Sequence, residues 1–170
     1  MNAPIATNER TDAPDSQDGL TGSTSLTGLT ALDTALQEHY RWFHRHPEPS
    51  YEEFETTARI RRILESHGIE ILDSGLKTGL VAIIRGHGRE DGRGRGHDEN
   101  GATAPVIALR GDIDGLPITE NTGLAYASKN PGLMHGCGHD FNLTVALGAA
   151  ILLKRQADNC GLNGTVKVIF

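Results

Sequence analysis

The segment MHGCGHD, residues 134–140, places a thiol, two imidazoles and a carboxylate within a few positions of one another. Cys137 and His139 are two residues apart, so in an extended loop both side chains point to the same side. A thiolate and an imidazole are ligands that suit zinc and similar divalent ions. Glycines on both sides of Cys137 allow the backbone to bend closely around an ion. This spacing is compatible with part of a metal site.

The same segment also has a purely structural interpretation. Cys137 can be a small buried side chain, His139 a hydrogen-bonded loop histidine, and Asp140 the N-cap of a following helix. A closed structural zinc site needs about four protein ligands, so the motif taken alone favours this structural interpretation. His135 is a further candidate ligand if the loop is extended, and its role stays open.

Two aspartates, Asp112 and Asp114, directly follow the apolar segment 105–110. If that segment is a strand, both lie just past its carboxyl end, where open α/β sheets usually bind ligands. Carboxylates there can bind a metal or orient a metal-bound histidine, and they can also cap a turn. The residues alone favour the turn for Asp112 and leave both roles open for Asp114.

Two helices are predicted before the first strand. Apolar residues recur at three- and four-residue steps over 29–43, which indicates an amphipathic helix. It should end before Pro47, which disfavours helical geometry in the residue preceding it. Ser50 and Glu53 form a capping-box pattern that predicts the start of a second helix. Gly68 is well placed to end that second helix.

Strands and one more helix are predicted in the remainder. The predicted strands are 68–75, 79–86, 105–112 and 164–170, and the apolar stretch 143–155 indicates a buried helix. We expect the strand over 105–112 to be buried and the apolar strand 166–170 to form an uncovered edge. The fold class is therefore α/β, a layered sandwich with helices packed on a mostly parallel or mixed sheet.

Two polar segments interrupt this pattern. Residues 1–25 are almost without apolar side chains and predict a disordered N-terminal tail. Residues 86–104 are rich in glycine and mixed charges without an aromatic residue, which predicts a flexible polar insertion rather than a nucleic-acid-binding element. The folded part is expected to span residues 26–170.

Composition excludes several classes of function. The 170-residue chain carries a formal net charge of −6, which argues against nucleic acid or an anionic membrane as partner. No apolar run approaches the roughly 20 residues that span a bilayer. The N-terminal residues contain no apolar core of a signal peptide, so we expect a cytoplasmic protein. Two cysteines, Cys137 and Cys160, do not indicate a disulfide framework.

Three longer motifs carry a family resemblance: RHPEPSYEE (45–53), ALRGDIDGLPITENTGLAYASKNPGLMHGCGHD (108–140) and GTVKVIF (164–170). In order and spacing they resemble the amidohydrolase branch of the metal-dependent aminoacylase and carboxypeptidase superfamily. This branch includes hippurate hydrolases, N-acyl-amino-acid amidohydrolases, N-acetyldiaminopimelate deacetylases and auxin-conjugate hydrolases. The resemblance implies a zinc-exopeptidase-like catalytic domain that hydrolyses the amide bond of N-acyl amino acids with metal-activated water.

The resemblance also assigns residues. It implies that Cys137 and His139 are metal ligands and that Asp114 is a catalytic residue that orients a ligand. It implies two divalent ions in the complete site, Zn²⁺ or Mn²⁺, with Co²⁺ or Ni²⁺ as alternatives. Asn142 departs from the pattern, since many relatives have a histidine there, and we expect this to alter the pocket rather than metal binding.

Relatives continue past the last strand with a Glu-Glu run, further ligand histidines and a lid or dimerisation domain, through which complete relatives often dimerise. We therefore expect residues 26–170 to be the N-terminal portion of the catalytic domain, truncated and inactive alone. An alternative hypothesis is a non-catalytic zinc-binding or redox-sensing module that uses Cys137.

Overall fold

The structure, a computed structural model, describes residues 26–86, 89–91, 95–97, 104–159 and 161–170. In chain order its elements are α1 (Leu26–Arg45), α2 (Phe54–Ser66), β1 (Glu70–Leu72), β2 (Val81–Arg85), β3 (Arg89–Asp91), β4 (Arg95–His97), β5 (Val106–Arg110), α3 (His139–Asn159) and β6 (Thr165–Ile169). The predicted tail over 1–25 lies outside the described residues. Within the described part of the chain, no helix is long and apolar enough to cross a membrane.

The main sheet has four strands in the order β1-β2-β6-β5. β1 pairs antiparallel with β2, and β2 pairs antiparallel with β6. β5 pairs with β6 in parallel, with Leu109 opposite Val168. The sheet is therefore mixed, and the predicted α/β class is confirmed. All four strands predicted from the sequence occur in it.

Two expectations about these strands were wrong. The last strand, β6, is central rather than an uncovered edge, and Val166, Val168 and Phe170 are buried. β5 forms the edge instead, and Val106 and Ile107 are exposed. β6 is paired on both sides and the core covers one of its faces, while Lys167 and Ile169 on the other face are exposed. Its position in the sheet depends on pairing with β2 and β5, which the composition of the strand does not supply.

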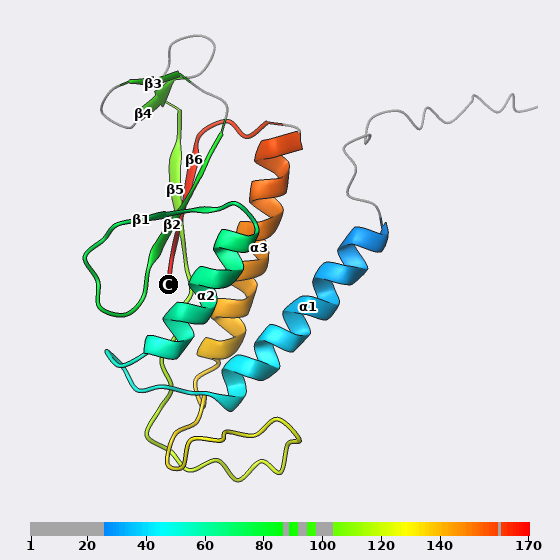
Figure 1. The fold of residues 1–170 in the computed structure, drawn as a ribbon, viewed down its shortest axis with the longest axis vertical. Coiled ribbons are helices and arrows are strands. Elements are labelled where there is room, and N and C mark those ends of the chain that lie inside the picture. The colour runs from blue at the N-terminus through cyan, green and yellow to red at the C-terminus, as the bar shows by residue number, and fades with distance from the viewer. Residues whose placement is uncertain (1–25, 87–88, 92–94, 98–103, 160) are drawn as a thin grey trace, which may run out of the picture.

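The helices cover the sheet as Figure 1 shows: α2 and α3 lie beside it, and α1 packs against α3. Their contact forms one core, in which Phe43, Ile60, Leu64, Leu147 and Val168 are almost inaccessible to solvent. One face of α3 is buried in this core. Its other face is not, because Phe141, Val145 and Leu152 are exposed, so the expectation that this helix is buried all round was wrong.

The two ends of α2 are stabilised by different hydrogen bonds. Its C-terminus is a Schellman motif, in which the Gly68 and Ile69 N–H groups donate to the carbonyls of Glu65 and Leu64. The predicted capping box is absent, because Ser50 bonds Asp114 and Glu53 makes no side-chain cap. The carboxylate of Glu48 instead accepts the N–H groups of Glu55 and Thr56, at 3.0 and 2.7 Å.

The polar segment 86–104 is described only in part. Within it, β3 and β4 pair antiparallel as a separate two-stranded ribbon. The remaining residues between 87 and 103 lie outside the described residues, and the flexibility of this insertion stays a prediction.

Candidate metal site

The residues singled out for chemistry meet at one edge of the main sheet. β5 and β6 run in parallel, so their carboxyl ends lie together, and Asp112 and Asp114 follow β5 directly. Leu116 and Met134 then exchange two backbone hydrogen bonds of 2.8 and 2.9 Å. This pairing places the beginning of the MHGCGHD segment beside the aspartate loop. Residues far apart in sequence are thereby brought to the edge where α/β sheets usually bind ligands.

His139 is oriented by Asp114. Its Nδ1 atom lies 2.8 Å from Oδ1 of Asp114 and 3.1 Å from the Asp114 carbonyl oxygen. Both partners are acceptors, so Nδ1 donates to them, and in the neutral ring this leaves the lone pair on Nε2. No described residue forms a hydrogen bond with Nε2. A carboxylate that accepts the Nδ1 proton is the usual means by which proteins orient a metal-binding histidine.

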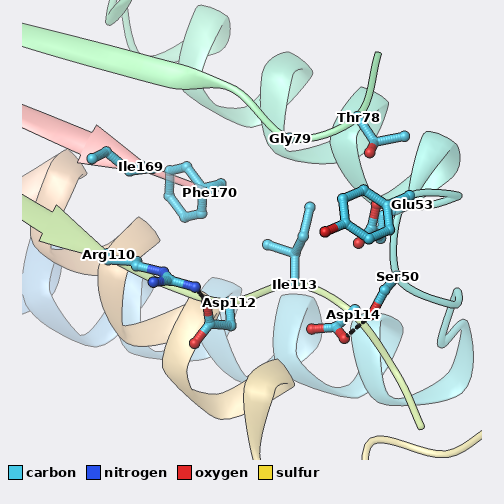
Figure 2. A pocket seen from close by; sticks show the side chains of 11 residues that line it. Ser50, Glu53, Thr78, Gly79, Arg110, Asp112, Ile113, Asp114, Ile169 and Phe170 are labelled. Atoms are coloured by element: carbon cyan, nitrogen blue, oxygen red, sulfur yellow. Dashed lines mark hydrogen bonds and ion pairs between the residues drawn. The ribbon is translucent and has the colours of Figure 1, made fainter. Parts of the chain in front are cut away.

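The carboxyl group of Asp114 is held in its ionised form. Partial burial alone would raise its pKa, but hydrogen bonds from Ser50 and His139 outweigh burial and lower the pKa. Ser50 Oγ donates to Oδ2, the oxygen that His139 does not use. Figure 2 shows this Ser50–Asp114 contact at the mouth of a pocket.

The sequence interpretation assumed that the MHGCGHD segment is extended, but in the structure it turns. Gly136 and Cys137 form a turn, Gly138 has a φ of 78°, and α3 begins at His139. A positive φ at Gly138 is a conformation that side-chain-bearing residues rarely adopt. The Cys137 thiol is free and exposed. The turn therefore leaves the thiol open to solvent, two residues before the oriented histidine in sequence.

His135 points elsewhere. It is only 5% exposed, and among the described residues neither of its ring nitrogens has a hydrogen-bond partner. Burial lowers its pKa, so the neutral ring is favoured. Cys137 is exposed and His135 is buried, and the loop between them turns rather than staying extended. The condition under which His135 was a candidate ligand is not met.

Asp140 is not the N-cap that the sequence indicated. It lies inside the first turn of α3, where its Oδ1 accepts the N–H of Phe141. Its other carboxylate oxygen, Oδ2, lies 2.6 Å from Nδ1 of His44. His44 in turn reaches Glu120 through Nε2, at 3.2 Å. Sequence reasoning missed this buried group, since nothing local relates residues so far apart.

A pocket of about 540 Å³ opens beside Asp114. As Figure 2 shows, Ile169 and Phe170 at the end of β6 line one side of it, and Ser50 and Glu53 line another. Asp112 also lines it and pairs with Arg110 at 2.5 Å, so this aspartate is held by a neighbouring charge rather than by a turn. Ser50 belongs to the motif RHPEPSYEE, to which sequence reasoning assigned no site residue.

The donors present fit part of a metal site. Cys137 offers an exposed sulfur, and His139 offers an imidazole nitrogen whose ring is oriented by a carboxylate, a set that suits a borderline divalent ion. In the described ranges, however, no three or more His, Cys, Asp or Glu side chains are grouped so that they could hold a metal ion. The arrangement offers fewer ligands than a closed site.

The chain is similar in sequence to metal-dependent peptidases and amidohydrolases. Residues 108–170 match the sequence profile of peptidase family M20/M25/M40, so the chain carries part of an M20 peptidase domain. It is 50% identical over 142 residues to an N-acetylcysteine deacetylase of Bacillus subtilis, a match that covers 82% of this chain and 33% of that protein. It is 35% identical to an N-acyl-L-amino acid amidohydrolase of Geobacillus stearothermophilus, which covers 76% of this chain and 31% of the relative.

The fold is also similar to that of a solved structure from the M20 family. The fold matches the YXEP protein of Bacillus subtilis, a dinuclear metal binding peptidase from the M20 family, with a TM-score of 0.70 and 48% identity. The match covers 83% of this chain and 35% of that one. The chain thus spans about a third of the length of these relatives.

Proposed function

We propose that the protein carrying this chain is a metal-dependent amidohydrolase that cleaves the amide bond of N-acyl amino acids. The single observation that supports it most directly is the 2.8 Å contact between Asp114 and His139, which leaves Nε2 of the histidine without a hydrogen-bond partner among the described residues. The names of the two amidohydrolase relatives support the substrate class.

In this proposal Cys137 Sγ and His139 Nε2 are metal ligands, and Asp114 positions the histidine through Nδ1. The site takes divalent ions, two in its complete form. Zn²⁺ suits the thiolate and imidazole donors, and the family resemblance adds Mn²⁺, with Co²⁺ or Ni²⁺ as alternatives. Such ions activate a water molecule at neutral pH and stabilise the oxyanion of the attacked amide. The ionised Asp114 keeps the proton of His139 on Nδ1, so the other nitrogen stays available as a ligand.

The proposal extends to organisation and setting. Residues 26–170 are the N-terminal portion of the catalytic domain, which the share of the relatives that they span supports. The partner is a small N-acyl amino acid in the cytoplasm, rather than nucleic acid or a membrane, which the net charge of −6 supports. Dimerisation through a further domain is part of the same family-based proposal.

Metal binding is the first test. Co²⁺ alone is titrated into the reduced chain while the thiolate-to-metal charge-transfer absorption is followed. Cys137→Ser should abolish this band, and His139→Ala should weaken binding. His67→Ala is the matched control, because His67 is an exposed histidine at the end of α2 and should leave the titration unchanged. A band that survives Cys137→Ser would contradict the proposed ligand.

Activity is the second test. The protein that carries this chain is loaded with Mn²⁺ or Zn²⁺ and assayed with a panel of N-acetyl and N-benzoyl amino acids. Amide hydrolysis that is lost in Cys137→Ser and His139→Ala, with the fold retained by circular dichroism, supports the proposal. Absence of hydrolysis with every substrate while metal is bound would contradict it.

A second candidate is a zinc-binding or redox-sensing module that uses Cys137 without catalysis. The exposure of the Cys137 thiol favours it, because an exposed thiol can be reached by oxidants. Tight binding of one zinc ion without hydrolysis, or reversible oxidation of Cys137 that changes metal binding, would favour this module over the hydrolase.

A further inference from the structure

The segment Pro47–Ser50 is fastened to the aspartate loop by backbone contacts. The Gly115 N–H donates to the Glu48 carbonyl at 2.7 Å, and Pro49 and Gly115 form a parallel β-bridge. A Cβ atom at Gly115 would lie 2.6 Å from Cβ of Pro47, so only glycine allows the two strands of chain to approach this closely. This segment is therefore held against the loop that carries Asp114 by backbone contacts.

Pro47 and Glu48 of this segment also form hydrogen bonds with other parts of the chain. Asn130 Nδ2 donates to the Pro47 carbonyl at 2.8 Å, from the loop that leads to MHGCGHD. The Glu48 carboxylate accepts two N–H groups at the start of α2. These contacts define where Ser50 stands relative to Asp114, although Ser50 itself is exposed.

From this position Ser50 completes a chain of hydrogen bonds. Its hydroxyl donates to Oδ2 of Asp114, while Oδ1 of the same carboxylate accepts the Nδ1 proton of His139. Each carboxylate oxygen thus has a different partner. A carboxylate with a single hydrogen bond can rotate about its Cβ–Cγ bond, whereas two partners on opposite oxygens restrict its plane.

We infer that Ser50 is a positioning residue of the candidate metal site, acting through Asp114 to hold the His139 ring in the orientation and tautomer that present Nε2. This inference rests on the proposed function. It gives the motif RHPEPSYEE a role in the site: the segment between α1 and α2 carries a hydroxyl to the carboxylate that orients the ligand.

The positioning role of Ser50 can be tested separately from any effect of Ser50 on the stability of the fold. Ser50 is exposed, so Ser50→Ala leaves no buried polar group without a partner and should not unfold the chain. Ser50→Thr keeps the hydroxyl and serves as the conservative rescue. Ser74→Ala is the matched control, because Ser74 is an exposed serine in the connection between β1 and β2. Circular dichroism and the urea midpoint verify that all variants are folded.

The decisive readout is the tautomer of His139 in the metal-free chain, measured by ¹⁵N chemical shifts of the two ring nitrogens. The wild type and Ser74→Ala should show Nδ1 protonated. Ser50→Ala should give mixed shifts from both tautomers, and Ser50→Thr should restore the wild-type pattern. Unchanged shifts in Ser50→Ala would overturn the inference. So would a failure of Ser50→Thr to restore them, since the hydroxyl would then not be the active group.

Metal affinity is the second readout. With Co²⁺ alone as the probe, Ser50→Ala should raise the Kd by about 3- to 10-fold, less than the roughly 10- to 100-fold typical when a partner of a ligand is itself removed. Asp114→Asn provides that larger reference. Ser50→Ala equal to wild type, with Asp114→Asn impaired, would overturn the role of Ser50 and leave the proposed function intact. Unchanged binding in His139→Ala would instead contradict the proposed function.

Discussion

Nδ1 of His44 lies 2.6 Å from Oδ2 of Asp140, which joins α1 to the first turn of α3 one residue after His139. The other ring nitrogen of His44 reaches Glu120 at 3.2 Å. Glu120 also accepts the N–H of Ser128 at 2.6 Å, in the loop that precedes MHGCGHD. The side chains of His44, Asp140 and Glu120 are only 7%, 3% and 2% exposed. One buried imidazole thus connects three segments around the candidate site.

Replacing His44 by alanine should strongly destabilise the chain. Both ring nitrogens face carboxylate oxygens, so the substitution leaves two buried carboxylates without their cationic partner. Removing one partner of a buried ion pair typically costs about 3–5 kcal/mol. The measurement is the free energy of unfolding in urea. His67→Ala, at an exposed histidine, should cost less than about 1 kcal/mol. Equal losses in both variants would refute the buried network.

The stability that His44 provides should depend on pH. Burial alone lowers the pKa of His44, but the hydrogen bonds from its ring to Asp140 and Glu120 outweigh burial and raise it above 6.5. For Glu120, burial would raise the pKa, but hydrogen bonds from Thr122, Ser128 and His44 lower it below 4.5. The His44 contribution is therefore complete below 6.5 and is lost as pH rises through the raised pKa. The Glu120 contribution is present above 4.5 and is lost as pH falls through the lowered pKa.

The pH dependence is measured as the difference in unfolding free energy between wild type and His44→Gln. This subtraction removes the titration of other histidines, including His39 and His67, whose pKa values burial lowers. The difference should be largest between about pH 4.5 and 6.5 and should shrink toward pH 9. A difference that grows from pH 6 to pH 9 would show that the assigned sign is wrong.

Glu48→Ala should destabilise α2 through its N-terminus. The variant removes the carboxylate that accepts the Glu55 and Thr56 N–H groups and that interacts favourably with the positive end of the helix dipole. A loss of about 1–2 kcal/mol is expected from the cost of removing helix caps. Glu52→Ala is the control, because Glu52 is exposed in the same loop. If both variants have the same urea midpoint, the capping role of Glu48 is refuted.

Gly115→Ala should disturb the site more than its small size implies. The added methyl group would lie 2.6 Å from Cβ of Pro47, on a segment that backbone hydrogen bonds hold in place. Overpacking of this kind costs about 1–3 kcal/mol. The variant should also separate Ser50 from Asp114 and weaken Co²⁺ binding. Gly132→Ala is the control: this glycine has open space around it but a φ of 79°, so alanine there should cost stability through backbone strain and leave metal affinity unchanged.

Much of the local structure could be predicted because it depends on near neighbours. Apolar periodicity over 29–43 corresponds to most of α1, and Gly68 ends α2 as expected. Prediction was wrong where a side chain had alternative partners. Ser50 was assigned to a capping box, but the nearby Asp114 carboxylate binds its hydroxyl and Glu48 caps the helix instead. A capping box at Ser50 would use the Glu53 N–H, whereas Glu48 accepts the N–H groups of Glu55 and Thr56. The choice depends on the Asp114 carboxylate, which is distant in sequence, so local sequence cannot distinguish the two arrangements.

The sequence by itself determined the helices and strands and the residue types from which a metal site can be built, including Cys137, His139 and Asp114. Only the tertiary structure decided which nitrogen of His139 is free, that His135 is buried, and that β5, not β6, is an edge strand of the sheet. The physical reason is that periodicity and turn chemistry act over a few residues. Burial and hydrogen-bond partners depend on segments such as 44, 114 and 140, which only folding brings together.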